Sequence, residues 1–129
     1  MAEPTAEDHN LIDLARKLIQ QRRSKWSGVA AVLTTSSGRI FQGVNIEIEA
    51  SAPCSICAEY AAIGTMLSEG EKEIETIAAV NAKGQVIPPC GKCRQFISEF
   101  GNPYVIVEIG GKLKKTRVTD LYPLGVSSE

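Results

Sequence analysis

Residues 88–95 read Pro-Pro-Cys-Gly-Lys-Cys-Arg-Gln, the most informative stretch of the chain. The two prolines end the preceding segment, and a helix over about residues 91–100 is predicted to begin directly after them. Cys90 and Cys93 are three residues apart, a spacing that turns both thiols the same way in the first turn of a helix. The unpaired N–H groups and partial positive charge of a helix N-terminus also stabilise thiolates. This stretch therefore predicts that Cys90 and Cys93 hold one metal ion.

A second cysteine pair, Cys54 and Cys57, precedes a helix predicted over about residues 56–68. Glu59 follows two positions after Cys57, and positions two apart on a helix point about 200° away from each other. Cys57 and Glu59 can therefore share a site only if it lies over the N-terminal end of the helix. Cys57 would then bind the ion while Glu59 reaches a water on its open face. Three protein ligands plus water are typical of catalytic zinc.

The cysteine spacing also allows an alternative, a closed metal site in which four protein ligands surround the ion. With Cys54 as a fourth ligand, the chain would be a structural four-cysteine zinc-binding module. The gap of 32 residues between the pairs is longer than the ~15–20 residues of common zinc ribbons. Glu59 would have no role in such a site, and a chain of this size does not need a metal to fold. A dithiol redox role is disfavoured because neither pair lies in a thioredoxin-like β-α-β context.

Outside the cysteine motifs, the pattern predicts a sheet covered by helices. Apolar residues at helical spacing predict an amphipathic helix over about residues 8–24. Extended runs at 29–35 and 39–46 flank a Ser-Ser-Gly turn and predict a β-hairpin. The other predicted elements are three strands and a short helical turn, at residues 74–81, 103–108, 112–118 and 119–122. The order α-β-β-α-β-α-β-β predicts an α/β fold with a mixed five-stranded sheet and helices on both faces.

Composition and charge narrow the class of protein. With 129 residues, 43% hydrophobic and 22% charged, the chain is expected to form a single soluble domain over residues 1–129. A formal net charge of -1 disfavours a nucleic-acid partner. No apolar run approaches the ~20 residues that span a bilayer, and the acidic N-terminus has no apolar signal-peptide region. We therefore expect a cytoplasmic protein with no membrane or nucleic-acid partner.

Together, the cysteine motifs resemble those of a known family. Cys57-Ala58-Glu59 followed by Pro89–Gln95 is similar to the signature of zinc nucleoside and nucleobase deaminases, His/Cys-Ala-Glu and then Pro-Cys-x-x-Cys. The three-cysteine form, with Arg-Gln after the last cysteine, resembles the short cytidine deaminases and also blasticidin S deaminase. The resemblance covers roughly residues 10–124 and includes the predicted hairpin. It implies the three-layer α-β-α cytidine deaminase fold and a homotetramer whose sites are completed by neighbouring subunits.

The resemblance also implies a reaction, the hydrolytic deamination of a free cytosine nucleoside. Zn²⁺ held by Cys57, Cys90 and Cys93 would lower the pKa of its water from ~15.7 toward ~7. Glu59 would pass protons from that water to N3 of the pyrimidine and to the departing amine, while hydroxide attacks C4. The backbone at Ala58 would help to hold the ring and its exocyclic group.

Other positions suggest roles in substrate choice and charge balance. Asn45 and Glu47 match the Asn-x-Glu with which cytidine deaminases bind ribose, and residues two apart on a strand share a face. This match favours cytidine or deoxycytidine, because blasticidin S deaminases lack that acid. Arg94 is expected to hydrogen-bond the sulfurs and offset the charge of three thiolates. Some family members place a second arginine after the glutamate, where this chain has Tyr60.

The C-terminal region departs from the cytidine deaminase pattern. Cytidine deaminases usually have a phenylalanine that covers the pyrimidine soon after a Leu-x-Pro. In this chain Leu121-Tyr122-Pro123 is followed by Leu124-Gly125-Val126, with no aromatic residue. A modified aminopyrimidine nucleoside, as in blasticidin S deaminase, therefore stays open as the substrate.

Overall fold

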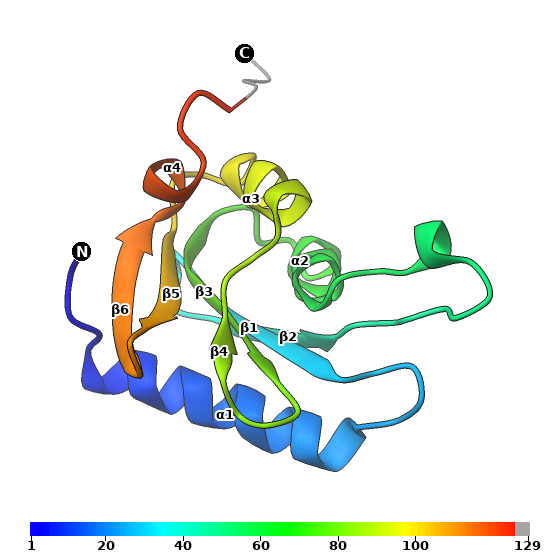
Figure 1. Ribbon diagram of the computed structural model, residues 1–129. Helices are drawn as coiled ribbons and strands as arrows, with labels where there is room; N and C mark the ends of the chain where they lie inside the picture. Colours follow the sequence, from blue (N-terminus) through cyan, green and yellow to red (C-terminus); the bar gives the residue numbers. More distant parts are fainter. Residues whose placement is uncertain (126–129) are drawn as a thin grey trace.

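A mixed β-sheet between two layers of helices forms the part of the chain that the structure describes, residues 1–125 (Figure 1). The structure is a computed structural model. In chain order its elements are α1 (Ala6–Arg22), β1 (Val29–Thr35), β2 (Ile40–Val44), the 3-10 helix η1 (Ala52–Cys54), α2 (Ala58–Ser68), β3 (Ile74–Asn81), β4 (Val86–Ile87), α3 (Gly91–Ser98), β5 (Tyr104–Ile109), β6 (Lys112–Arg117) and α4 (Val118–Leu121).

The sheet follows the order β2-β1-β3-β5-β6, and β4 pairs with β3 outside this path. β3 and β5 are parallel, and the other paired strands are antiparallel. The predicted α/β fold with a mixed sheet is confirmed, as is the order of the predicted elements. β4 makes the sheet six-stranded rather than five-stranded. Its two residues, directly before Pro88, are too few to show the periodicity of a strand.

Helices cover both faces of the sheet, with α1 on one face and α2 and α3 on the other (Figure 1). Ala31 and Leu33 of β1 belong to the core beneath α2 and α3, whereas Ala30 and Val32 belong to the core beneath α1. Because β1 is buried on both faces, its sequence is a continuous apolar run rather than an alternating one. Within residues 1–125, the helices are too short or too polar to cross a membrane.

The parallel pairing of β3 and β5 positions the two helices that follow the cysteine motifs. α2 leads into β3 and α3 comes before β5, and both helices pack on the same face of the sheet. Since the two strands run in the same direction, α2 and α3 bring their N-termini to the same end of the sheet. Gly43 lets α2 pack closely on β2, because an added Cβ there would lie 2.5 Å from the Ala62 backbone nitrogen.

A capping box fixes the start of α1, two residues before the predicted start. The Asp8 N–H donates to Thr5 Oγ1 (3.2 Å) and the Thr5 N–H donates to Asp8 Oδ2 (2.8 Å). Lys115 Nζ of β6 also donates to Asp8 Oδ2, at 2.9 Å. Burial alone would raise the pKa of Asp8, but the hydrogen bonds from Thr5 and Lys115 outweigh burial and lower it below its ordinary value of 3.8.

Replacing Asp8 by asparagine is expected to lower the free energy of unfolding by about 1–3 kcal/mol at neutral pH, because Lys115 loses its buried charged partner. A lowered carboxyl pKa contributes stability above the unfolded-state pKa, and this contribution is lost as pH falls through the folded-state pKa. The difference in unfolding free energy between wild type and variant should therefore be constant near neutral pH and should disappear below about pH 4. Urea unfolding across this range measures it, and a gap that widens in acid would contradict the assignment.

Candidate active site

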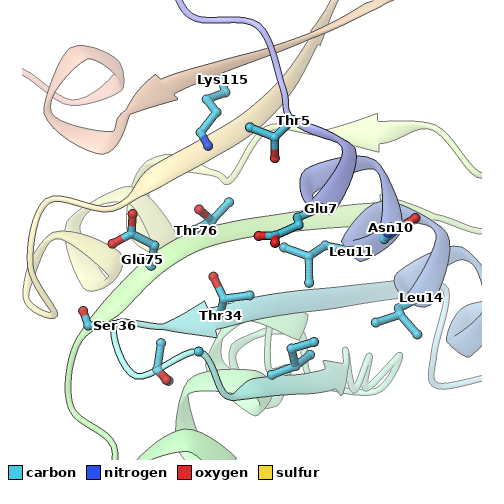
Figure 2. A pocket seen from close by; sticks show the side chains of 13 residues that line it. Thr5, Glu7, Asn10, Leu11, Leu14, Thr34, Ser36, Glu75, Thr76 and Lys115 are labelled. Atoms are coloured by element: carbon cyan, nitrogen blue, oxygen red, sulfur yellow. The ribbon is translucent and has the colours of Figure 1, made fainter.

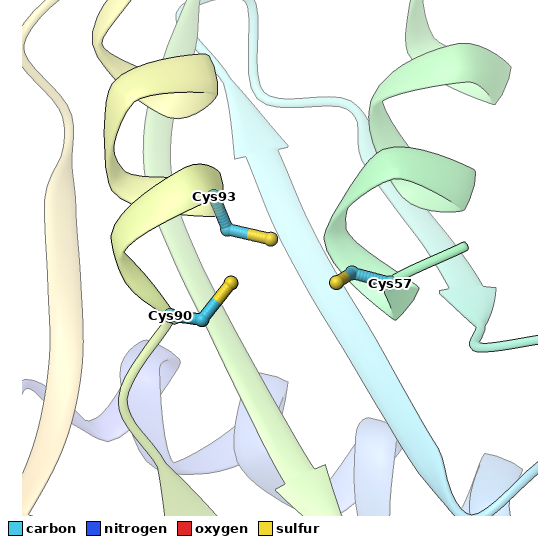
Figure 3. A group of neighbouring side chains, drawn as sticks. All are labelled: Cys57, Cys90 and Cys93. Carbon is cyan, nitrogen blue, oxygen red and sulfur yellow. The ribbon is translucent and has the colours of Figure 1, made fainter. Parts of the chain in front are cut away.

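The N-termini of α2 and α3 bring three cysteines together. Cys57 is the N-cap residue of α2, Cys90 is the N-cap residue of α3, and Cys93 lies in the first turn of α3. Their Sγ atoms all lie within 4.8 Å of one another (Figure 3). Both caps have extended backbone conformations and no side-chain capping hydrogen bond. The thiols are therefore left to point toward one another over the two helix ends.

The donor set fits zinc. Tetrahedral coordination with Zn–S distances of about 2.3 Å places sulfurs about 3.8 Å apart, within reach of the observed cluster. Cys54 is not part of this group: it is exposed in η1, and its thiol donates to Ser51 Oγ at 3.4 Å. The structure therefore assembles three sulfur ligands and not the closed four-cysteine site.

The three thiols differ in how readily they ionise. Burial raises the pKa of Cys93, which is 1% exposed, and the Glu59 carboxylate raises it further. Burial also raises the pKa of Cys57. Burial acts in the same direction on Cys90, but hydrogen bonds from the N–H groups of Cys93 and Lys92 and from the neighbouring thiols outweigh it, and the pKa of Cys90 is lowered. A bound cation favours thiolates at all three positions because it replaces their protons.

Glu59 is a buried carboxyl group beside the cysteines. It lies in the first turn of α2, is only 6% exposed, and lines the same cleft as the three sulfurs. Burial raises the pKa of Glu59, because removal from water disfavours its charged form. A raised pKa makes the Glu59 carboxylate a stronger base and brings its pKa closer to the range that general acid–base chemistry uses.

A cleft of about 490 Å³ joins the cysteine cluster to the predicted substrate-binding residues. Its lining comprises Val29, Asn45, Ile46, Glu47, Ala52, Ser55, Ile56, Cys57, Ala58, Glu59, Ile87, Pro88, Cys90, Lys92 and Cys93. The structure thus brings all predicted metal, proton-transfer and substrate residues to one cavity. The apolar lining residues Val29, Ile46, Ile56 and Ile87 were not predicted from the sequence, nor was Lys92. Lys92 could have been noticed from its place between two metal-ligating positions.

Asn45 is held in a defined orientation at the end of β2. Its Oδ1 accepts hydrogen bonds from the backbone N–H groups of Gly28 (2.8 Å) and Val29 (3.0 Å). The Ser27 hydroxyl donates to the Asn45 carbonyl at 2.7 Å. Since Oδ1 already has two donors, the amide group of Asn45 is left to act as a hydrogen-bond donor toward the cleft.

Glu47 lies two residues further along, beyond the end of β2. Its backbone N–H donates to the Trp26 carbonyl at 2.7 Å, which continues the extended conformation past Val44. The intervening Ile46 pairs instead with Ile56. Asn45, Ile46 and Glu47 all line the cleft, and the shared face of Asn45 and Glu47 stays a prediction.

Arg94 is not among the described residues that line the cleft. Its Nε donates to the Pro89 carbonyl (2.8 Å) and its Nη1 donates to the Leu121 carbonyl (3.0 Å). These bonds connect the residue before Cys90 to the end of α4. The expected contact of Arg94 with the sulfurs stays a prediction.

A second cavity, of about 630 Å³, lies between the start of α1 and the ends of β1 and β3 (Figure 2). Thr5, Glu7, Thr34, Glu75 and Lys115 are among its lining residues. The residues predicted from the sequence as ligands or catalytic groups do not line it. Although this cavity is larger, the chemistry is concentrated in the cleft with the cysteines.

Comparison with known proteins agrees with this geometry. A family model described as the cytidine and deoxycytidylate deaminase zinc-binding region matches residues 5–109. The chain is 34% identical over 128 residues to a blasticidin-S deaminase of Bacillus cereus, covering 92% of this chain and 91% of that protein. It is 42% identical over 98 residues to a probable cytidine deaminase of Dictyostelium discoideum, covering 74% of this chain and 66% of that protein.

Solved structures show the same fold. The crystal structure of the cytidine deaminase from Burkholderia pseudomallei superimposes with a TM-score of 0.78 and 30% sequence identity, over 95% of this chain and 100% of that chain. A zinc-binding hydrolytic deaminase is therefore the class that the fold and the three-cysteine cleft define. The chain belongs to the cytidine and deoxycytidylate deaminase family.

Proposed function

We propose that this protein hydrolyses the 4-amino group of a free cytosine nucleoside, converting cytidine or deoxycytidine and water to the uracil nucleoside and ammonia. The observation that carries the proposal is one cleft that contains three sulfur ligands, a buried Glu59 and the pair Asn45 and Glu47. In this proposal residues 1–129 form one deaminase domain that acts in the cytoplasm, without a nucleic-acid or membrane partner.

Proton transfer in this mechanism is the task of Glu59. Zinc, when bound by Cys57, Cys90 and Cys93, makes a water molecule acidic enough to serve as the nucleophile near neutral pH. Glu59 accepts the proton that this water loses, and then donates it to N3 of the pyrimidine as C4 is attacked. Glu59 then takes the proton of the hydroxyl group added at C4 and passes it to the amino group, so that the C4 carbonyl forms and ammonia leaves as the C4–N bond breaks. The same buried carboxyl therefore acts as base and then as acid.

Substrate positioning follows from the hydrogen-bonding capacity of the cleft. The Ala58 N–H lies in the first turn of α2, where N–H groups have no partner within the helix, and it can bind the base. Asn45 offers an amide donor and Glu47 offers a carboxylate acceptor to the same cleft. Such a pair matches the hydroxyl groups of a sugar, each of which both donates and accepts.

An ammonia-release assay with zinc-loaded protein tests the proposed function. The panel comprises cytidine, deoxycytidine, cytosine, 5-methylcytidine, blasticidin S and guanine. We expect turnover of cytidine and deoxycytidine, and much weaker turnover of cytosine because it has no sugar for Asn45 and Glu47 to bind. Turnover of blasticidin S alone would contradict the proposed substrate.

Glu47→Gln is expected to reduce kcat/KM for cytidine about 10–100-fold, mainly through KM, because one charged hydrogen bond to the sugar is lost. Turnover of free cytosine should change little. Glu49→Gln is the matched control, since Glu49 is exposed and is not among the residues that line the cleft. Equal losses for cytidine and cytosine would show that Glu47 does not bind the sugar.

A blasticidin S-type deaminase is the second candidate. Its support is the similarity to the Bacillus cereus protein, which extends over 92% of this chain. The cleft also has no aromatic residue among its described lining residues to stack on a pyrimidine. Leu124 is fully exposed, and Val126 lies outside the described residues. The blasticidin S arm of the same panel decides between the two candidates.

The proposal includes assembly into a homotetramer. Three large apolar side chains near the cleft are exposed: Trp26 by 50%, Ile46 by 41% and Ile56 by 40%. Exposed apolar groups that lie together are typical of surfaces that become buried on association. Light scattering coupled to gel filtration measures the mass of the assembly in solution. A stable monomer with full activity would contradict this part of the proposal.

A further inference from the structure

The metal cluster concentrates negative charge in a confined space. Three thiolates around one Zn²⁺ leave a formal charge of -1, and the carboxyl of Glu59 lines the same cleft. Cys93 and Glu59 are both buried, so water can screen this charge only in part. A site of this kind binds its metal more tightly when a positive side chain lies close to it.

Lys92 is a positively charged residue next to the predicted metal ligands. It lies between Cys90 and Cys93 in the first turn of α3, and its backbone N–H donates to the Cys90 thiol. Its side chain lines the cleft together with the three cysteines, and it is the one basic residue in the described lining. The Lys92 ammonium lies 4.9 Å from the centre of the Tyr60 ring.

Tyr60 gives this ammonium a contact on α2, three residues after Cys57. Its ring, on α2, packs against Phe96 of α3 with 4.2 Å between ring centres. The face of an aromatic ring attracts a cation and restricts where the flexible lysine side chain can lie. Besides burial, the negative charges of the three cysteines and of Glu59 raise the pKa of Tyr60. The Tyr60 ring is therefore near enough to the three cysteines and Glu59 for their charges to act on it.

We propose that Lys92, held against the face of Tyr60, is a positioning residue whose positive charge offsets the excess negative charge of the three-thiolate site and strengthens metal binding. Arg94 is less suited to this role, because two of its donor groups bind the carbonyls of Pro89 and Leu121. Among residues 1–125, the Lys92 ammonium contacts the Tyr60 ring and takes part in no hydrogen bond or ion pair. The inference concerns metal binding and does not depend on the proposed substrate.

The test is a zinc competition titration with a chromogenic chelator at low ionic strength. Lys92→Met should lower the zinc affinity about tenfold, as expected for removing one unit charge near a partly exposed site. Lys92→Arg should restore most of it, and high salt should narrow the difference between wild type and Lys92→Met. Lys112→Met is the matched control, because Lys112 is an exposed lysine on β6. Cobalt loading checks that each variant keeps the sulfur-to-metal absorption of an intact site.

A second pair of variants tests the aromatic contact. Tyr60→Leu removes the ring face and should lower zinc affinity in the same direction as Lys92→Met, whereas Tyr60→Phe keeps the face and should not. When Tyr60→Leu and Lys92→Met are combined in one chain, the loss of zinc-binding free energy should be smaller than the sum of the two separate losses. Wild-type zinc affinity in Lys92→Met would overturn the proposal. So would a loss in Lys92→Met that neither arginine nor salt reduces, since that result indicates packing rather than charge.

Discussion

Replacing Glu59 by glutamine is expected to reduce kcat for nucleoside deamination by about 10²–10⁴-fold while zinc binding is retained. Glutamine keeps the size of the buried side chain but can neither accept nor deliver a proton at these steps. Because the three sulfurs are unchanged, zinc content should stay at about one ion per chain. Steady-state ammonia release and metal analysis of the same preparation measure both quantities.

Glu75→Gln is a suitable control for this experiment. Glu75 is an exposed glutamate on β3 that lines the other cavity, so its charge change should leave turnover unaltered. If Glu59→Gln retained wild-type turnover, Glu59 would have no part in the reaction. Loss of zinc together with activity would instead show that the carboxyl is needed to build the site.

Replacing Cys93 by alanine is expected to abolish stoichiometric zinc binding and with it the deaminase activity. Cys93 is 1% exposed and belongs both to the sulfur cluster and to the core beneath α2 and α3. Its loss leaves two protein ligands, too few for a catalytic zinc site. Metal analysis after dialysis measures the loss, and thermal unfolding should show a lower Tm because the stabilisation by bound metal is gone.

Cys54→Ala is the matched control for the loss of Cys93. The Cys54 thiol is exposed in η1 and lies outside the sulfur cluster, so this variant should keep zinc, stability and turnover. If Cys54→Ala lost its zinc while Cys93→Ala kept it, the assignment of the ligands would be wrong.

The metal cluster could be predicted from the sequence because its geometry is mostly local. Cys90 and Cys93 lie within one helical turn, and Cys57 lies at a second helix start. Bringing the two helix ends together requires α2 and α3 to pack side by side, which follows from the parallel pairing of β3 and β5. The resemblance to a family supplied this long-range information, since residue spacing alone leaves both an open and a closed site allowed.

Features that depend on contacts between distant residues could not be predicted. The carboxamide of Asn45 is oriented by N–H groups 16 and 17 residues away, and nothing in a local pattern identifies such partners. The later start of α2, at Ala58, arises because Ile56 pairs with Ile46. The carbonyl partners of Arg94 include Leu121, which α4 brings near α3. In each case tertiary packing, and not local propensity, decides the contact.

X-ray absorption at the zinc edge of the metal-loaded protein tests the central claim most directly, because it counts the sulfur ligands around the ion. An open catalytic site predicts three sulfurs at about 2.3 Å and one oxygen at about 2.0 Å, with the same spectrum in a Cys54→Ser variant. Four sulfurs, with the fourth lost in Cys54→Ser, would contradict the account.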